Sequence, residues 1–173
     1  RIPAIIDKNN NNYSLFESGA ILMYLAEKSG KLINKSNSDE YYRTIEWLMW
    51  QMGGVGPMFG QVHHFVKYNK GKSAYAEERY SKEARRLYGV MDKRLGQHQF
   101  ISGKEYSIAD ISIWPWTARF DWQEIDLNGF TIKQSDIHYI QQRFFTVIEL
   151  NASPFVKPQG PADFGEITFP QNI

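Results

Sequence analysis

The chain has 173 residues, of which 42% are hydrophobic and 15% aromatic, a composition typical of a folded protein with a substantial core. Its formal charge of +1 gives no net field that would attract nucleic acid or an anionic membrane, and no apolar run approaches the roughly 20 residues that cross a bilayer. It contains no cysteine, which excludes a disulfide, a thiol nucleophile and a thiolate metal site within this chain.

Two short strands are predicted at 4–7 and 13–16, joined by an asparagine-rich turn whose residues tolerate left-handed backbone. Pro3 heads the first strand, where its missing N–H does not disturb a ladder. If the Ile2–Pro3 peptide bond is cis, which costs only about 0.5–1 kcal/mol before proline, the N–H and C=O of Ile2 can face outward. They could then pair with an extended peptide as an added strand.

A helix is predicted over 18–28, with Glu17 and Ser18 at its start. The first N–H groups of a helix lack intrahelical partners and carry a partial positive charge, so this end can bind an anion. A ligand with both an α-carboxylate and an α-ammonium would satisfy the Ser18 hydroxyl and the Glu17 carboxylate together. The competing interpretation is ordinary helix capping, and the segment from Ser14 to Glu17 also fits a capping box one turn earlier.

Two further helices are predicted after this one. Gly30 is expected to end the first helix, and a polar linker follows at 31–37. Ser38 then begins a longer helix whose first turn is acidic. Three glycines and a proline within 53–57 are expected to kink this helix or to let another backbone or a ligand come close. Another long helix is predicted from about 74 to 95.

The strongest helix-start signal in the chain lies at Ser107 and Asp110, which form the two halves of a capping box. Pro115 should kink or end the helix that follows. Ser135 caps a last predicted helix, and the proline-rich tail from 151 precludes regular structure.

Arg79 is the cation best suited to bind a ligand. It lies one turn into the 74–95 helix, where a guanidinium can point into a cleft and grip a carboxylate at two points. The alternative is a surface arginine paired with Glu83 at i+4. His63 and His64 are adjacent, so on a helix they point about 100° apart, and no third ligand follows at suitable spacing. Packing in the core or a cleft is therefore favoured over a metal site.

Several other side chains are weaker candidates. Three could line the same cleft as Arg79: Arg1, Gln61 and Tyr75. Three others could form an adaptable apolar pocket for a second substrate: Met52, Met58 and Phe59. Four tryptophans are expected mainly in the core: Trp47, Trp50, Trp114 and Trp116.

Five segments resemble the glutathione transferase superfamily: IPAIID, LFESGAILMYLAEKSG, WLMWQMGGVGPMFGQVHHF, YAEERY and YSIADISIWPW. The resemblance runs from Arg1 to about Val147. It is most specific in the WQMGGVGPMFGQVHHF block, which is similar to the bacterial Nu class of glutathione-dependent disulfide-bond oxidoreductases.

The resemblance implies an α+β fold, in which a partial thioredoxin-like α/β domain is followed by an all-α glutathione-transferase C-terminal domain. The expected division is a glutathione-binding domain at 1–30, a linker at 31–38, the all-helical domain at 39–150 and an extended tail at 151–173. The first half of the thioredoxin-like domain is expected to be missing from the chain. The catalytic residues and the groups that stabilise the thiolate are expected in that missing half.

The resemblance also implies a glutathione site that needs no metal. Ile2 and Pro3 would hold the cysteinyl backbone by strand-like pairing. Glu17 and Ser18 would hold the γ-glutamyl end, and Arg79 a distal carboxylate. Because the chain has no cysteine, its part would be to position and stabilise the thiolate of glutathione itself.

The implied reaction is thiol–disulfide exchange between glutathione and a small disulfide, carried out by a homodimer with no nucleic-acid or membrane partner. Two alternatives stay open. One is conjugation of glutathione to a small electrophile at the same site, and the other is a non-catalytic glutathione-transferase-like binding module. No signal-peptide pattern opens the sequence, so we expect a cytoplasmic location.

Overall fold

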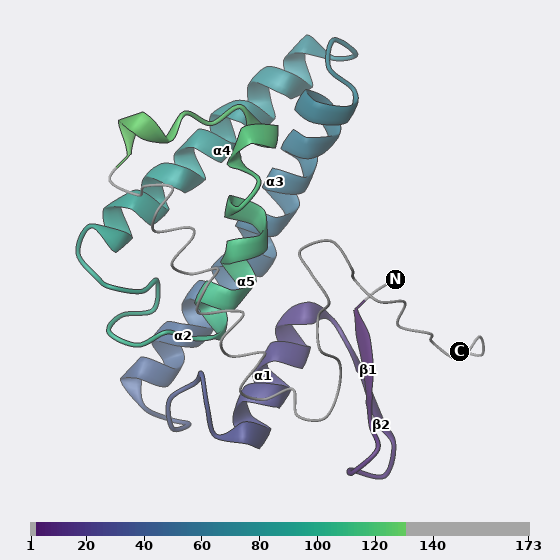
Figure 1. The fold of residues 1–173 in the computed structure, drawn as a ribbon, viewed down its shortest axis with the longest axis vertical. Coiled ribbons are helices and arrows are strands. Elements are labelled where there is room, and N and C mark those ends of the chain that lie inside the picture. Colours follow the sequence, from purple (N-terminus) through teal and green to yellow (C-terminus); the bar gives the residue numbers. More distant parts are fainter. Residues whose placement is uncertain (1–2, 131–173) are drawn as a thin grey trace, which may run out of the picture.

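The computed structural model describes residues 3–130. It begins with an antiparallel hairpin of β1 (Ala4–Asp7) and β2 (Tyr13–Phe16), in the predicted positions. The turn between them places Asn11 at φ 50° and Asn12 at φ 55°, which confirms the left-handed backbone expected from the asparagines. α1 (Ser18–Ser29) follows directly and lies beside the hairpin (Figure 1).

Polar contacts hold α1 on the hairpin. The Asp7 carboxylate at the end of β1 accepts a hydrogen bond from the Tyr24 hydroxyl at 2.5 Å and an ion pair from Lys28. The rings of Tyr13 and Tyr24 lie 5.7 Å apart. Gly30, at φ 65°, ends the helix in the left-handed conformation, as its residue type predicts.

One helical run then crosses the molecule in four consecutive segments: α2 (Asp39–Trp50), the π-helical η1 (Gln51–Val55), α3 (Gly56–Val62) and the π-helical η2 (His63–Tyr68). The glycine cluster therefore changes the helix without ending it. A π segment admits an extra residue into a helical turn, and such segments often accompany functional sites. The glycines here also permit close packing, because a Cβ on Gly56 would lie 2.8 Å from Gln51 Nε2.

α4 (Ala74–Leu95) has the predicted bounds and runs back along α3 (Figure 1). α5 (Ile108–Thr117) begins at the predicted capping box, where the backbone N–H and the hydroxyl of Ser107 both donate to Asp110 Oδ2 at 3.0 Å. Pro115 does not stop this helix at once, and two more residues remain helical. The described chain then ends with two short 3₁₀ turns, η3 (Phe120–Gln123) and η4 (Leu127–Gly129).

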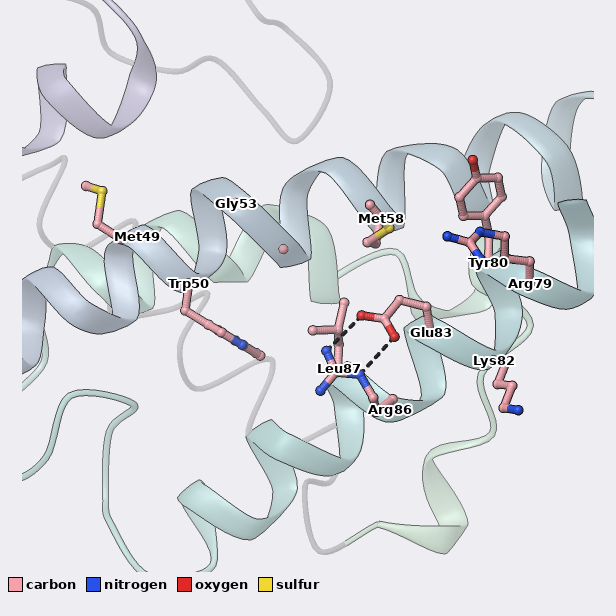
Figure 2. Close-up of a pocket in the computed structure, with 11 residues that line it drawn as sticks. Met49, Trp50, Gly53, Met58, Arg79, Tyr80, Lys82, Glu83, Arg86 and Leu87 are labelled. Atoms are coloured by element: carbon pink, nitrogen blue, oxygen red, sulfur yellow. Dashed lines mark hydrogen bonds and ion pairs between the residues drawn. The ribbon is translucent and has the colours of Figure 1, made fainter.

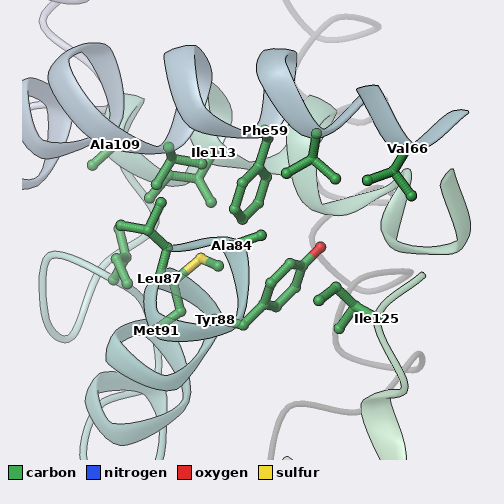
Figure 3. Packing of buried hydrophobic residues seen from close by; sticks show 12 residues of the cluster. Phe59, Val66, Ala84, Leu87, Tyr88, Met91, Ala109, Ile113 and Ile125 are labelled. Atoms are coloured by element: carbon green, nitrogen blue, oxygen red, sulfur yellow. The ribbon is translucent and has the colours of Figure 1, made fainter. Parts of the chain in front are cut away.

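The main core lies between α3, α4 and α5 (Figure 3). At its centre the rings of Phe59 and Tyr88 stack at 5.0 Å with an interplanar angle of 12°, and neither is exposed. A second cluster joins α1 to the helical part through three buried side chains: Ala26, Leu48 and Ile108. Burial of the Leu48 and Ile108 side chains contributes about 1.5–3 kcal/mol each, so the hairpin and α1 are anchored by apolar packing.

Some predictions fall outside residues 3–130, namely those on Arg1 and Ile2, on the last helix capped by Ser135 and on the tail. Across the part of the chain that is described, no helix is both long enough and apolar enough to cross a membrane.

Candidate functional site

The start of α1 does not have an ordinary side-chain cap. Glu17 is the N-cap residue, but its side chain makes no capping hydrogen bond and is exposed. Its backbone is at φ 72° and ψ 118°, a conformation that L side chains rarely adopt and that costs on the order of 1–3 kcal/mol. Ser14 lies within β2, so the alternative capping box one turn earlier is wrong. Glu17 is thus held in a strained conformation with its carboxylate free to meet a ligand.

Ser18 is half-buried beside this carboxylate, at the first position of α1. Its hydroxyl does not cap the helix but donates to the sulfur of Met52 in η1, at 3.6 Å. The first N–H groups of α1 have no partners within the helix and no cap from Glu17, so this end of the helix can meet an anion. Together these groups match an α-carboxylate beside an α-ammonium.

The hairpin lies next to the start of α1 and contributes an edge of β1 to the candidate site. Pro3 is exposed and immediately precedes β1, which confirms its place at the head of the strand. Among residues 3–130, β1 pairs only with β2, so its other edge has no strand partner there. Ile2 lies outside the described residues, and its proposed pairing with a peptide stays a prediction.

Arg79 lies in a separate groove between the α2–η1–α3 run and α4, with a volume of about 800 Å³ (Figure 2). Figure 2 shows Met49 at one end of this groove and Arg79 with Tyr80 at the other. Glu83 accepts hydrogen bonds from Arg86 at 2.7 and 2.8 Å, so in place of the alternative Arg79–Glu83 pair the structure has an Arg86–Glu83 pair. The bonds from Arg86 lower the pKa of Glu83, and the charge of Arg79 lowers it further by a smaller amount.

The groove and the α1 start are neighbours rather than one pocket. Leu87 of α4 lies against Gly54, since a Cβ added to Gly54 would be 3.8 Å from Leu87 Cδ2. Gly54 is two residues after Met52 in η1. Arg79 is about 12 Å further along α4 from Leu87. Glu17 and Ser18 are adjacent at the start of α1, whereas the structure places Arg79 in the separate groove.

His63 is buried among aromatic rings and belongs to the core. Its ring stacks on Trp116 at 6.0 Å and lies edge-on to Trp122 at 5.7 Å. Gln123 Nε2 lies 3.0 Å from His63 Nε2 and donates to the Trp116 carbonyl at 2.8 Å, while its Oε1 accepts from the Tyr88 hydroxyl at 2.7 Å. This pattern leaves His63 Nε2 as the acceptor, which requires a neutral ring.

The charge state of His63 follows from its surroundings. Burial lowers the pKa of the ring, the Arg119 charge lowers it further, and Asp121 opposes them by a smaller amount. Across residues 3–130, no three His, Asp or Glu side chains gather as a metal site. Core packing is therefore the structural role of His63.

The weaker candidates are scattered. Gln61 and Tyr75 are exposed, and Arg1 lies outside the described residues. The expected pocket of Met52, Met58 and Phe59 is not formed as one unit. Met58 lines the groove, Phe59 is in the core, and Met52 contacts α1. The four tryptophans lie partly buried against the core, as expected.

Sequence reasoning missed two contacts, Met52 with Ser18 and Gln123 with His63. Both join segments far apart in the chain, and no local pattern marks either of them.

Comparison with known proteins gives matches along the chain. A family model described as "Glutathione S-transferase, C-terminal domain" matches residues 74–125. Disulfide-bond oxidoreductase YfcG of Escherichia coli K12 is 48% identical over 131 residues, which are 73% of this chain and 60% of that protein. Disulfide-bond oxidoreductase YghU of the same organism is 44% identical over 67% of this chain and 40% of its own length. The chain thus spans 40–60% of these two relatives.

Solved structures match the fold. A glutathione transferase from Burkholderia graminis, with two glutathione molecules bound per subunit, is 38% identical at a TM-score of 0.73, over 90% of this chain and 68% of that one. Another from Pseudomonas putida, with one glutathione disulfide bound per subunit, is 41% identical at a TM-score of 0.67, over 86% of this chain and 65% of that one. The expected fold class is confirmed: part of a thioredoxin-like α/β domain followed by a helical glutathione-transferase C-terminal domain.

Proposed function

The chain belongs to the glutathione transferase family, and from this premise we propose that it binds glutathione at the start of α1 and supports glutathione-dependent thiol–disulfide exchange. The observation that carries the proposal is the pair Glu17 and Ser18. Glu17 has a strained backbone and makes no capping bond, and Ser18 presents a hydroxyl next to the free N–H groups of α1. Such a pair fits the γ-glutamyl end of glutathione, whose carboxylate and ammonium lie on one carbon.

The rest of the tripeptide would extend from α1 along the hairpin. Ile2 and Pro3 would hold the cysteinyl backbone by strand-like pairing, because β1 has no strand on its other edge among residues 3–130. Arg79 would bind a distal carboxylate in its groove. Because its groove does not include Glu17 or Ser18, we expect Arg79 to bind the far half of a glutathione disulfide or a second glutathione, and the Pseudomonas putida and Burkholderia graminis relatives were solved with these ligands.

The exchange reaction needs a thiolate that this chain does not carry. The glutathione thiolate attacks one sulfur of a small disulfide, a new S–S bond forms, and the other sulfur leaves as a thiolate. The chain has no cysteine, so its role is to hold the attacking sulfur of glutathione in line with the S–S bond that breaks and to bind the charged ends of glutathione. The catalytic residues that stabilise the thiolate would lie outside this chain.

Titration calorimetry with glutathione tests the binding proposal. We expect binding at one or two sites per chain, weakened when Arg79 is replaced by alanine and unaffected when the exposed Arg85 is replaced in the same way. Turnover of a small glutathione-reducible disulfide against that of an aryl halide separates exchange from conjugation. Absence of glutathione binding would favour a non-catalytic module and overturn the proposal.

The assembly and location belong to the same proposal. We infer a homodimer in the cytoplasm, with a glutathione-binding part at 1–30, a linker at 31–38 and a helical domain at 39–150. Large exposed apolar side chains support a dimer, and one of them, Met49, lines the groove.

A further inference from the structure

We propose that Met52 is an oxidation-sensitive residue that controls glutathione binding through Ser18. This inference rests on the proposed function, because it needs glutathione at the start of α1. It adds a modification site in the helical domain and names peroxides as the class of reagent that would act there.

The geometry couples the two residues directly. Met52 lies in the π-helical η1, and its sulfur accepts a hydrogen bond from the Ser18 hydroxyl, with 3.6 Å between the oxygen and the sulfur. Its side chain also lies against the first turn of α1, since a Cβ on Gly19 would come within 3.1 Å of Met52 Cγ and 3.2 Å of its sulfur. Met52 therefore links the helical domain to the first turn of α1, where we propose that glutathione binds.

The acceptor strength of this sulfur matters because a hydroxyl has one proton to donate. A thioether is a weak acceptor, so a glutathione carboxylate, which is charged, draws the Ser18 proton away from Met52 at little cost. In its reduced form Met52 thus holds the hydroxyl in place without competing for it.

Oxidation would reverse this balance. One oxygen atom passes from a peroxide to the Met52 sulfur: the O–O bond breaks, an S–O bond forms, the sulfur loses two electrons and hydrogen peroxide is reduced to water. The sulfoxide oxygen is a strong acceptor and would keep the Ser18 proton. It also needs room beside Gly19, where the contacts are already close.

The composition and the exposure of the methionines make Met52 a target for a peroxide. The chain has no cysteine, so its five methionines are the sulfurs that a peroxide can oxidise. Met52 is half-buried, whereas Met91 is only 1% exposed. Met49, at 47% exposed, lies in the same helical run outside the contact with Ser18 and is a matched control.

The test treats the purified protein with hydrogen peroxide, maps methionine sulfoxide by mass spectrometry and measures glutathione affinity by calorimetry before and after. We expect treatment to weaken affinity about five- to tenfold in the wild type and in Met49→Leu, but less than twofold in Met52→Leu. A methionine sulfoxide reductase should restore the affinity of the treated wild type. An unchanged affinity with Met52 fully oxidised, or an equal loss in Met52→Leu, would overturn the inference.

Met52→Gln provides a test without an oxidant, because its amide oxygen is a strong acceptor at the same position. We expect it to bind glutathione about five- to tenfold more weakly than Met52→Leu, and equal affinities of the two variants would contradict the proposal. If the untreated wild type does not bind glutathione, the proposed function fails and this inference fails with it. If the untreated protein binds and oxidation has no effect, only this inference fails.

Discussion

Glu17, at the start of α1, lowers the stability of the fold because it leaves the helix uncapped, and its carboxylate stays available to a ligand. A capping side chain at this position would satisfy the first N–H groups of the helix and contribute about 0.5–2 kcal/mol. Glu17 instead makes no capping bond and has a positive φ of 72°. A strained backbone that persists at a helix start is typical of a ligand clamp, because the fold must hold it by other contacts.

Ser18→Ala removes the hydroxyl that we expect to bind the γ-glutamyl carboxylate. The loss of one donor to a charged group should weaken glutathione binding by about 1–2 kcal/mol, measured by calorimetry. Ser14→Ala is the matched control, because Ser14 is exposed on β2 and belongs to the same short segment. An unchanged affinity in a normally folded Ser18→Ala protein would remove this residue from the site.

Glu17→Gly separates the strain from the charge. Glycine adopts positive φ freely, so the variant should be more stable than the wild type by about 1 kcal/mol in urea unfolding, while it binds glutathione more weakly. Glu17→Gln keeps the strained backbone and loses the charge, so we expect weaker binding without a gain in stability. A less stable Glu17→Gly protein would show that the backbone at this position carries no strain.

The residue types of the proposed site come from the sequence, but their surroundings do not. Glu17 and Ser18 were found from a local signal, the change from an extended to a helical pattern. The positive φ of Glu17 depends on the path from β2 to α1, and the contact of Ser18 with Met52 joins residues 34 positions apart. Arg79 was found as a cation on a helix, but its groove exists only once α4 packs on η1.

At the scale of whole elements, three helices within residues 3–130 begin at a serine cap. Ser38 accepts from Tyr41 N at 3.1 Å, Ser73 from Ala76 N at 3.3 Å and Ser107 from Ala109 N at 3.3 Å. Only Ser107 is part of a closed capping box, with its own N–H and hydroxyl donating to Asp110. This box is buried, and Asp110 also accepts from Ile101 N at 2.9 Å, so it ties the preceding loop to α5.

The same substitution at the three caps should therefore have unequal effects. We expect Ser107→Ala to destabilise the protein by about 2 kcal/mol and Ser38→Ala or Ser73→Ala by about 1 kcal/mol, because only Ser107→Ala leaves a buried carboxylate with one donor fewer. Urea unfolding of the three variants checks this order. Equal losses at all three caps would mean that the box adds nothing beyond an ordinary cap.

The amide of Gln123 connects three elements: η2 through His63, α4 through Tyr88 and the end of α5 through the Trp116 carbonyl. His63 must stay neutral to accept its share of these bonds. Its ordinary pKa is 6.5 in the unfolded chain, and burial lowers the pKa in the folded protein. Below pH 6.5 the unfolded chain therefore binds more protons than the folded one, and stability falls with falling pH.

His63→Gln should remove this pH dependence, since glutamine offers an acceptor oxygen that does not titrate. The contribution of His63 is fully present above about pH 6.5, and we expect the wild type to lose up to about 1 kcal/mol from it by pH 5.5, as measured by urea unfolding. Burial raises the pKa of Asp110 to about 6, which favours the folded state as pH falls, but Asp110 is present in both proteins and cancels in the comparison. His64→Gln, on an exposed neighbour, should retain the wild-type pH dependence.

At the scale of the whole molecule, the order of the elements was predictable because each depends on local signals. Cap and turn residues predicted the positions of the strands, the end of α1 at Gly30 and the bounds of α4. The persistence of helix through the glycine cluster was not predictable, since it depends on packing that the linear sequence does not contain. The Leu87 contact at Gly54 and the Gln51 contact at Gly56 are examples.

The Met49 end of the groove between η1 and α4, away from Arg79, is where we expect two copies of the chain to meet. It combines apolar side chains such as Met49 and Met58 with both charge signs, as in Glu83 and Arg86, which suits a two-fold interface in which each copy offers the same surface. A stable dimer covers roughly 800 Å² on each partner, more than the groove floor, so the flanking helix faces would take part.

Light scattering should therefore give a mass near twice the 20.2 kDa of the chain, and Met49→Glu should shift it toward the monomer by burying an unpaired charge at the interface. Met49 is 47% exposed within one copy, so the variant should still fold. Tyr68→Glu is the control, because Tyr68 is 64% exposed and contacts Trp122 outside the groove. A monomeric wild type would refute the dimer, and a dimeric Met49→Glu protein would refute this groove as its interface.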